Sequence, residues 1–346
     1  MRRPPRPSPL PFLLLPLLAL ALTACGGSSA ADVGGRTDGK GPMTLNVGDQ
    51  RGGSEAVLRA AGELDGLTYK IKWSTFTSGP PLLESVNAGA VDVGGVGNTP
   101  PVFAAAAKSK IKIVAATHGS AAADAILVRS DSPLKRTADL RGRSIAVAQG
   151  SSAHYQLVVS LAKAGLSPKD VRLSLLQPAD ALAAFSRGKV DAWAVWDPYT
   201  SQALRNAGAR TLTTGQGVVN GLSFQVAAPG ALADGKKSAA VKDYVERLRR
   251  AQDWVHRHPE DWAEVWAKDT GLPYDVALDA VRRSAGTRVP VAVDDAAVAA
   301  EQKIVDTFAR LGLIPRAYRF ADFVDRGFNG SLPPSTTAPR TYGKAS

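Results

Sequence analysis

The stretch GGVGNTPPVFA, residues 94–104, joins the end of a β-type run to the start of a helix. Gly97, Asn98 and Thr99 suit a helix cap, and prolines are tolerated in the first helical turn, where their missing N–H would have no partner. Three further segments have the same form: Thr77-Ser78-Gly79-Pro80-Pro81, Gly150-Ser151-Ser152-Ala153-His154 and Trp196-Asp197-Pro198-Tyr199. One such segment is only a good cap, but four of them predict a chain in which helices repeatedly follow strands.

The chain keeps this alternation up to about residue 227. Short β-type runs such as Leu45 to Val47, Ser144 to Val147 and Ala192 to Trp196 are separated by helical patterns. Repeated strand, helix and strand predict an α/β protein with largely parallel sheets. Beyond residue 237 apolar residues at helical spacing predict two amphipathic helices, one with Val241, Tyr244, Val245, Leu248 and Val255, the other with Val298, Ile304, Val305, Phe308 and Leu311.

The capped helix starts indicate what kind of ligand to expect. In an open α/β sheet the carboxyl ends of the strands face one crevice, and helix N-termini there present free N–H groups and a partial positive charge to an anion. One helix end contributes about 0.3–1 kcal/mol, whereas micromolar binding needs about 8 kcal/mol. Side chains must therefore supply the rest: hydrogen bonds from Ser78, Thr99, Ser151, Ser152, Gln50 or Arg51, and apolar cover from Trp196 and Phe224.

Composition excludes several other classes of protein. The 346 residues suit about two domains, and the net charge of +11 is spread along the chain without a basic, aromatic-rich stretch, so no nucleic-acid partner is expected. The single cysteine, Cys25, excludes an internal disulfide and a cysteine zinc site. The four histidines lack metal-ligand spacing, and no Gly-x-Ser-x-Gly, phosphate-loop or His-Glu-x-x-His motif occurs. We expect no metal, no cofactor and no catalysis.

The N-terminal residues predict export and a lipid anchor. Arg2, Arg3 and Arg6 precede a Leu-rich stretch from Leu10 to Leu22, which is too short to span a bilayer, so residues 1–24 are interpreted as a signal peptide. The sequence Leu-Thr-Ala-Cys-Gly that ends it resembles a bacterial lipobox, with Cys25 as the acylated residue. Residues 25–42 have the Gly/Ser composition of a flexible tether, and residues 331–346 that of a disordered tail.

Several motifs together resemble the aliphatic-sulfonate-binding proteins of bacterial ABC importers. They are residues 76–84, 94–104, 150–155, 177–181 and 190–199, in order and with matching spacing, within a similarity that runs from about residue 44 to residue 330. The resemblance implies a type II periplasmic-binding-protein fold, in which two α/β lobes are joined by two crossover strands and close on a sulfonate. Lobe 1 would be residues 43–127 and 224–330, lobe 2 residues 128–223, and the crossovers would lie near Ala125 to Arg129 and Ser223 to Ala227.

The resemblance also implies a role in transport. The protein would be a monomer, lipid-anchored on the outer face of the cytoplasmic membrane, that delivers a small anion to an ABC permease and its ATPase for sulfur uptake. Aliphatic sulfonates are the expected ligands; taurine, nitrate and a thiamine-type pyrimidine stay open as alternatives, as does an enzyme on the same fold. Asp49, Asn98 and the pair Phe224-Gln225 depart from the pattern common in the family, and all lie in the expected pocket region.

Two candidate residues allow two interpretations each. His154 either donates a hydrogen bond to a sulfonate oxygen or packs against the neighbouring lobe, and Asp197 either binds a ligand ammonium or, as we prefer, caps the helix after it. The full set of predicted ligand-binding residues is Gln50, Arg51, Ser78, Gly79, Asn98, Thr99, Ser151, Ser152, His154, Trp196, Asp197 and Phe224.

Overall fold

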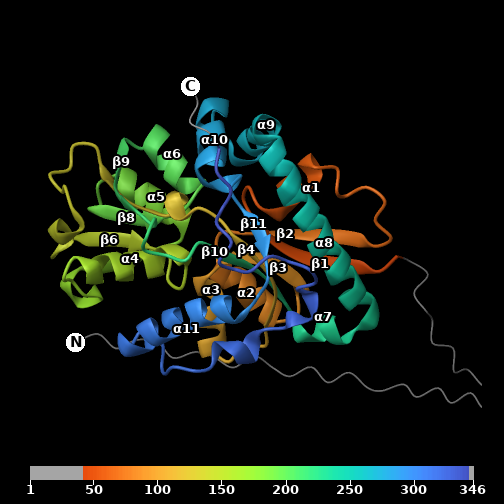
Figure 1. The fold of residues 1–346 in the computed structure, drawn as a ribbon. Coiled ribbons are helices and arrows are strands. Elements are labelled where there is room, and N and C mark those ends of the chain that lie inside the picture. The colour runs from red at the N-terminus through yellow and green to blue at the C-terminus, as the bar shows by residue number, and fades with distance from the viewer. Residues whose placement is uncertain (1–41, 343–346) are drawn as a thin grey trace, which may run out of the picture. The chain divides into compact units, whose positions relative to one another are not determined.

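Two β-sheets, each lying between helices, organise residues 42–342, the part of the chain that the computed structural model describes (Figure 1). The first sheet has six strands in the order β11-β4-β10-β3-β1-β2. Their bounds are β1 (Thr44–Gln50), β2 (Lys70–Phe76), β3 (Val93–Gly97), β4 (Lys112–His118), β10 (Leu222–Ala227) and β11 (Val289–Val291). The second sheet has the order β7-β6-β8-β5-β9, with β5 (Ala125–Arg129), β6 (Ser144–Val147), β7 (Arg172–Leu175), β8 (Ala192–Val195) and β9 (Ala209–Thr214).

Each sheet is buried between two apolar clusters. The first sheet packs on one face against α1 (Ser54–Ala60), α8 (Gly235–Arg257), α9 (Pro259–Thr270) and α10 (Tyr274–Ala280), and on the other against α2 (Gly79–Asn87), α3 (Thr99–Ala106), α7 (Pro229–Ala233) and α11 (Asp295–Arg310). The second sheet packs against α4 (Ser152–Lys163) on one face and α5 (Pro178–Ser186) and α6 (Tyr199–Asn206) on the other. These are the two α/β lobes of a type II periplasmic-binding-protein fold.

The long helices follow the apolar spacing of the sequence. In α8 the residues Val241, Tyr244, Val245, Leu248 and Val255 are all buried, and the helix ends before Pro259 as predicted. α11 likewise buries Ile304, Val305 and Phe308. The predicted parallel pairing holds for β1 with β2 and β3 and for β6 with β7 and β8. The other strand pairings among residues 42–342 are antiparallel: β10 with β3 and β4, β11 with β4, and β5 with β8 and β9. The sheets are therefore mixed and not largely parallel as predicted, because β5 and β10 each enter their sheet from the other one.

The chain passes between the sheets in two short segments, residues 119–124 and 215–221. The predicted crossover near Ala125 to Arg129 is wrong, because β5 pairs along its length with β8 and β9 inside the second sheet. β10, which includes the second predicted crossover, belongs to the first sheet. The two segments run side by side: Gly119 N–H donates to the Gly221 carbonyl (3.0 Å). A Cβ on Gly221 would lie 2.3 Å from the Gly119 carbonyl oxygen, so this close approach needs glycine.

The C-terminal segment is ordered up to residue 342, so the predicted disorder is wrong for residues 331–342. Ala292 N–H donates to the Pro333 carbonyl (2.8 Å), and Arg340 N–H donates to the Thr287 carbonyl (2.9 Å). Ser335 is 6% exposed and bonds to Asp294. Prolines in this segment reduce the conformational entropy lost on ordering, which lets a few hydrogen bonds hold it. Residues 343–346, the predicted signal peptide, Cys25 and the tether up to residue 41 lie outside the described residues.

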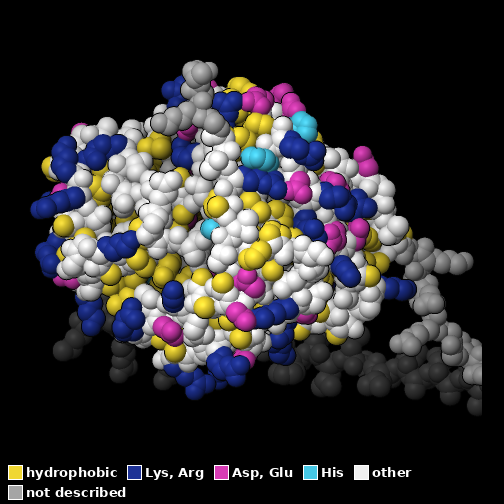
Figure 2. Space-filling view, in the orientation of Figure 1, with side chains coloured by type: hydrophobic (Ala, Val, Ile, Leu, Met, Phe, Trp, Pro, Cys, Tyr) yellow, Lys and Arg dark blue, Asp and Glu magenta, His cyan; other side chains and the backbone are white. Residues whose placement is uncertain are grey.

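The distribution of basic side chains and the hydropathy of the helices bear on possible partners. Figure 2 shows Lys and Arg side chains spread over the outer parts of the face in view and not gathered in one block. Among residues 42–342, no helix combines the length and apolar character that crossing a membrane requires.

Candidate ligand-binding site

A cavity of about 250 Å³ lies at the carboxyl ends of β1, β3 and β4, beside both segments that connect the sheets. Its wall also includes the starts of α2 and α4 and the loop before α6. The structure brings most of the predicted site residues together there: Gln50, Arg51, Gly79, Asn98, Ser151, Ser152, Trp196, Asp197 and Phe224 line it. A cavity of this size and mixed lining suits a small organic molecule.

Ser78, Thr99 and His154 are not brought to the cavity wall. The Ser78 hydroxyl donates to Gln177 Oε1 of the second lobe (2.8 Å), and the Thr99 hydroxyl donates to Asn98 Oδ1 (2.9 Å). Both side chains are fully buried. Their hydrogen bonds therefore serve the contact between lobes and the neighbouring asparagine.

His154 packs against the other lobe, the second of its two interpretations. Its ring lies 5.9 Å from that of Phe103 and 5.3 Å from that of Phe308, both in the first lobe, and Gly150 N–H donates to Nδ1 (3.2 Å). Burial lowers the pKa of His154 to about 4, so the ring is neutral near pH 7. A neutral ring between two phenylalanines stabilises the docking of the lobes.

The polar side chains at the starts of α4 and α1 mostly form hydrogen bonds with backbone groups of the protein itself. Ser151 Oγ accepts from His154 N–H (3.3 Å) and donates to the Ala148 carbonyl (2.7 Å), as a helix cap does. The Asp49 carboxylate accepts from Ser54 N–H (2.8 Å) and Glu55 N–H (2.7 Å), so the acid that departs from the family pattern caps α1. Burial raises the pKa of Asp49 to about 6.

Arg51 lines the cavity, but its guanidinium is bound at the end of α9. It donates to the carbonyls of Asp269 (3.4 Å) and Thr270. These carbonyls belong to the last turn of the helix, where a positive charge is favourable. The Arg51 guanidinium therefore stabilises the end of α9 in the first lobe and does not point freely into the cavity.

Arg288 is the cationic wall residue that the sequence analysis missed. It follows the π-helical turn at Val281–Ala285 and precedes β11, and it lines the cavity. Within residues 42–342 its guanidinium makes no hydrogen bond and no ion pair, whereas Arg51 and Arg249 on the same wall are both engaged. Arg288 is exposed on the wall of the cleft, and its guanidinium stays charged at any physiological pH. Only a lone arginine before a Val-Pro-Val run marks it in the sequence.

Asp124 places a carboxyl group on the same wall. It ends the first connecting segment, and the Ser152 hydroxyl donates to its Oδ1 (3.4 Å). Burial, with a smaller contribution from the nearby Asp197 charge, raises the pKa of Asp124 to about 7, while the hydrogen bond from Ser152 and the charge of Arg288 act in the opposite direction. At neutral pH this group can therefore carry either a proton or a negative charge.

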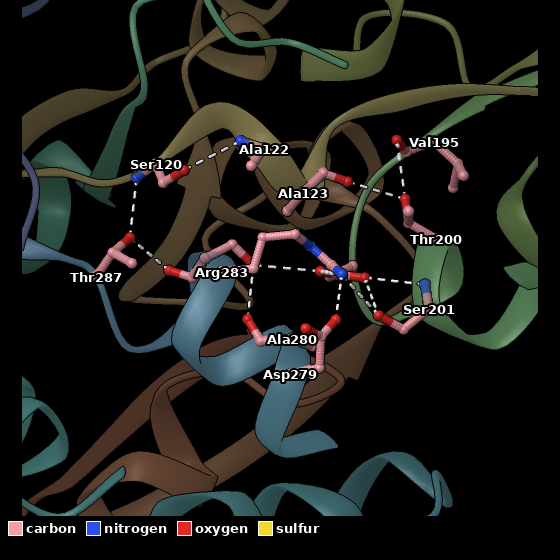
Figure 3. Close-up of polar contacts among 12 residues, drawn as sticks. Ser120, Ala122, Ala123, Val195, Thr200, Ser201, Asp279, Ala280, Arg283 and Thr287 are labelled. Carbon is pink, nitrogen blue, oxygen red and sulfur yellow. Dashed lines mark hydrogen bonds and ion pairs between the residues drawn. The ribbon is translucent and has the colours of Figure 1, made fainter. Parts of the chain in front are cut away.

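Asp197 joins the two lobes beside the cavity. Its Oδ1 accepts from Ser201 N–H (3.0 Å) and Ser201 Oγ (2.7 Å) in α6, in agreement with the preferred capping role. Its Oδ2 accepts from Arg283 Nη2 (2.9 Å) and Ser284 Oγ (3.2 Å) of the π-helical turn in the first lobe. Figure 3 shows Arg283 extending from that turn toward Ser201, with Asp279 beneath it. The lobes are thus linked by a carboxylate that is 4% exposed.

A cavity between two α/β lobes that meet at two short connections defines the class as a type II solute-binding protein. The chain belongs to the NMT1-like family, which matches residues 50–268. It is 36% identical to an aliphatic sulfonates-binding protein of Escherichia coli (strain K12) over 280 residues, covering 80% of this chain and 86% of the relative. It is 30% identical over 329 residues to a protein of the same description from Bacillus subtilis (strain 168), covering 92% and 95%.

A solved structure agrees with these relatives. The alkanesulfonate-binding protein SsuA of Xanthomonas axonopodis pv. citri, bound to MOPS, has a TM-score of 0.75 and 35% identity. The match covers 83% of this chain and 99% of that protein. The resemblance predicted from the motifs is confirmed.

Proposed function

We propose that the protein is the extracytoplasmic binding component of an ABC importer and captures aliphatic sulfonates for sulfur uptake. The observation that carries this proposal is the Arg288 guanidinium, which has no hydrogen bond or ion pair within residues 42–342 and lies on a cavity wall that also holds the starts of α2 and α4. A free cation and helix N-termini favour a small anion. The named relatives support a sulfonate as that anion.

Closure of the lobes would report that ligand is bound. Residues from both lobes line the cavity, so a ligand that touches both favours the closed arrangement over an open one. A permease that recognises the closed form would then accept only loaded protein. The lipobox-like sequence around Cys25 supports acylation of that residue and attachment to the outer face of the cytoplasmic membrane. The proposed working unit is the monomer.

A ligand screen tests the proposed substrate class. We expect ethanesulfonate and longer alkanesulfonates to raise the melting temperature in a dose-dependent way, because a ligand that binds only the folded state stabilises it by mass action. Sulfate, nitrate, taurine and a pyrimidine are the comparison ligands. A rise with one of these and none with any alkanesulfonate would retain the importer class and contradict the sulfonate assignment.

Binding of a simple alkanesulfonate is expected to weaken about tenfold between pH 6 and pH 8. The sulfonate stays an anion, whereas Asp124, with a pKa of about 7, loses its proton and adds a like charge to the wall. A like charge in the same cavity costs about 2 kcal/mol at an effective dielectric constant of 20, and proton uptake on binding offsets part of this. Titration calorimetry at both pH values measures the change.

Asp124→Asn is the control for this pH dependence. The variant should bind alkanesulfonate almost equally at pH 6 and pH 8, and any remaining dependence centred near pH 6 belongs to Asp49. Affinity that rises with pH in the wild type would instead favour a second candidate, an aminosulfonate such as taurine, whose ammonium would pair with the ionised Asp124. The position of Asp124 on the wall, with one long hydrogen bond, is the observation that keeps this candidate open.

A further inference from the structure

The cavity does not end at the cleft between the lobes. It continues into the first lobe along a wall that we call the inner branch, made by the apolar side chains of Val57 of α1, Val245, Leu248 and Val255 of α8, and Trp262 and Trp266 of α9. Arg249 and Gln252 of α8 also line the cavity. All six apolar side chains belong to the core of that lobe. Protein cores are packed as densely as organic crystals and seldom hold voids larger than a water molecule. A cavity that opens into such a core points to an occupant.

Two buried polar atoms on the wall support an occupant independently. Trp262 is 2% exposed, and within the described residues its Nε1–H has no hydrogen-bond partner. Gln225 Oε1, in β10 below the same helices, is also buried without a partner among residues 42–342. Both residues line the cavity. Buried polar groups are nearly always hydrogen-bonded in folded proteins, so a donor and an acceptor left open on one wall fit a ligand that carries a polar group.

We propose that the inner branch receives the organic group of the bound sulfonate, and that the protein selects sulfonates long enough to reach α8 and α9. This inference rests on the proposed function, since it requires the sulfonate group to lie near Arg288 in the cleft. The organic group then lies along Val57 and Leu248, and Trp262 Nε1–H donates to an acceptor carried at its far end. Figure 1 shows α8 and α9 beside α1, the three helices that wall the inner branch.

Chain length and a filled cavity test the assignment. Burial of each methylene strengthens binding about fourfold, so hexanesulfonate should bind at least about tenfold more tightly than ethanesulfonate if two of its four extra methylenes enter the inner branch. Leu248→Phe, which projects a larger side chain into the space, should remove this gain and leave ethanesulfonate within about twofold of wild type. Leu248→Met keeps the volume and is the matched control. If Leu248→Phe fails to fold, Val57→Leu fills the same space from α1.

The outcomes separate this inference from the function it rests on. Ethanesulfonate and hexanesulfonate binding with equal affinity would overturn the inner branch as a binding site and leave the sulfonate function intact, as would a Leu248→Phe variant that weakens both ligands equally. Failure of every sulfonate to bind would overturn both.

Trp262→Phe tests the polar contact separately. Hexanesulfonate with a hydroxyl on its last carbon should bind wild type about as well as hexanesulfonate does, because the hydroxyl finds a partner in Trp262. Trp262→Phe also removes part of the inner-branch wall, so both ligands should bind more weakly, but the hydroxylated ligand should lose about tenfold more affinity than hexanesulfonate does. Equal affinity of the two ligands for the variant would overturn the assignment of Trp262.

Discussion

Arg288→Ala is expected to weaken ethanesulfonate binding about 100-fold at pH 7. A hydrogen bond to a charged group contributes about 1.5–3 kcal/mol, and a guanidinium can donate two parallel hydrogen bonds to neighbouring oxygens of the sulfonate. About 3 kcal/mol corresponds to roughly two orders of magnitude in the dissociation constant. Titration calorimetry measures this directly. The variant should fold normally, because Arg288 has no hydrogen bond or ion pair to lose among residues 42–342.

Two variants control for the loss of positive charge. Arg288→Lys keeps the charge but not the planar fork, and we expect an intermediate loss of about tenfold. Arg249→Ala removes another arginine from the same cavity wall, but its guanidinium is already paired with Glu246 at 2.7 Å, so affinity should stay within about threefold. If Arg249→Ala and Arg288→Ala lose the same affinity, the total positive charge around the cavity determines binding, and not a hydrogen bond from Arg288. Unchanged binding by Arg288→Ala would move the anion away from this wall.

The fold could be predicted from local sequence because its signals are local. Helices begin at Gly79, Thr99 and Ser152 as the sequence predicts, although only the last start has a side-chain cap, from Ser151. The helices α8 and α11 follow the apolar spacing. The position of the connecting segments depends on pairing between distant strands. β5 is apolar enough for either sheet, and only its pairing with β8 and β9 assigns it to the second. Such pairing leaves no mark in a single sequence.

The sequence predicts the site residues that end strands or begin helices. It does not predict residues such as Arg288, which belong to no recognisable motif. Gln50, Asn98, Ser152 and Trp196 end strands or begin helices, and the structure brings them to one cavity. The inner branch was missed because its residues look like ordinary core in the sequence, with helical spacing on α8 and α9.

Asp197→Ala is expected to open the lobes and reduce ligand affinity about 100-fold. The Asp197 carboxylate is 4% exposed and accepts hydrogen bonds from Arg283, Ser284 and Ser201, and a hydrogen bond to a charged group contributes about 1.5–3 kcal/mol. Loss of the hydrogen bonds to Ser201 weakens the start of α6. Loss of the contacts with Arg283 and Ser284 weakens the link between the lobes, so a smaller fraction of the protein is closed, and the apparent affinity falls in proportion to that fraction. Small-angle scattering without ligand should show a larger radius of gyration, and calorimetry should show the weaker binding.

Asp279→Asn provides the matched control because it breaks the other ion pair of the same arginine. Asp279 Oδ2 lies 2.6 Å from Arg283 Nη1, but both residues belong to the first lobe and the Asp279 side chain is 70% exposed. That exposed pair contributes little to stability, and it does not link the lobes. Affinity and scattering of Asp279→Asn should match the wild type. If both variants bind equally well, the contact of Asp197 with the π-helical turn does not control closure, and the lobes are held together chiefly by Gln177 with Ser78 and by His154 between Phe103 and Phe308.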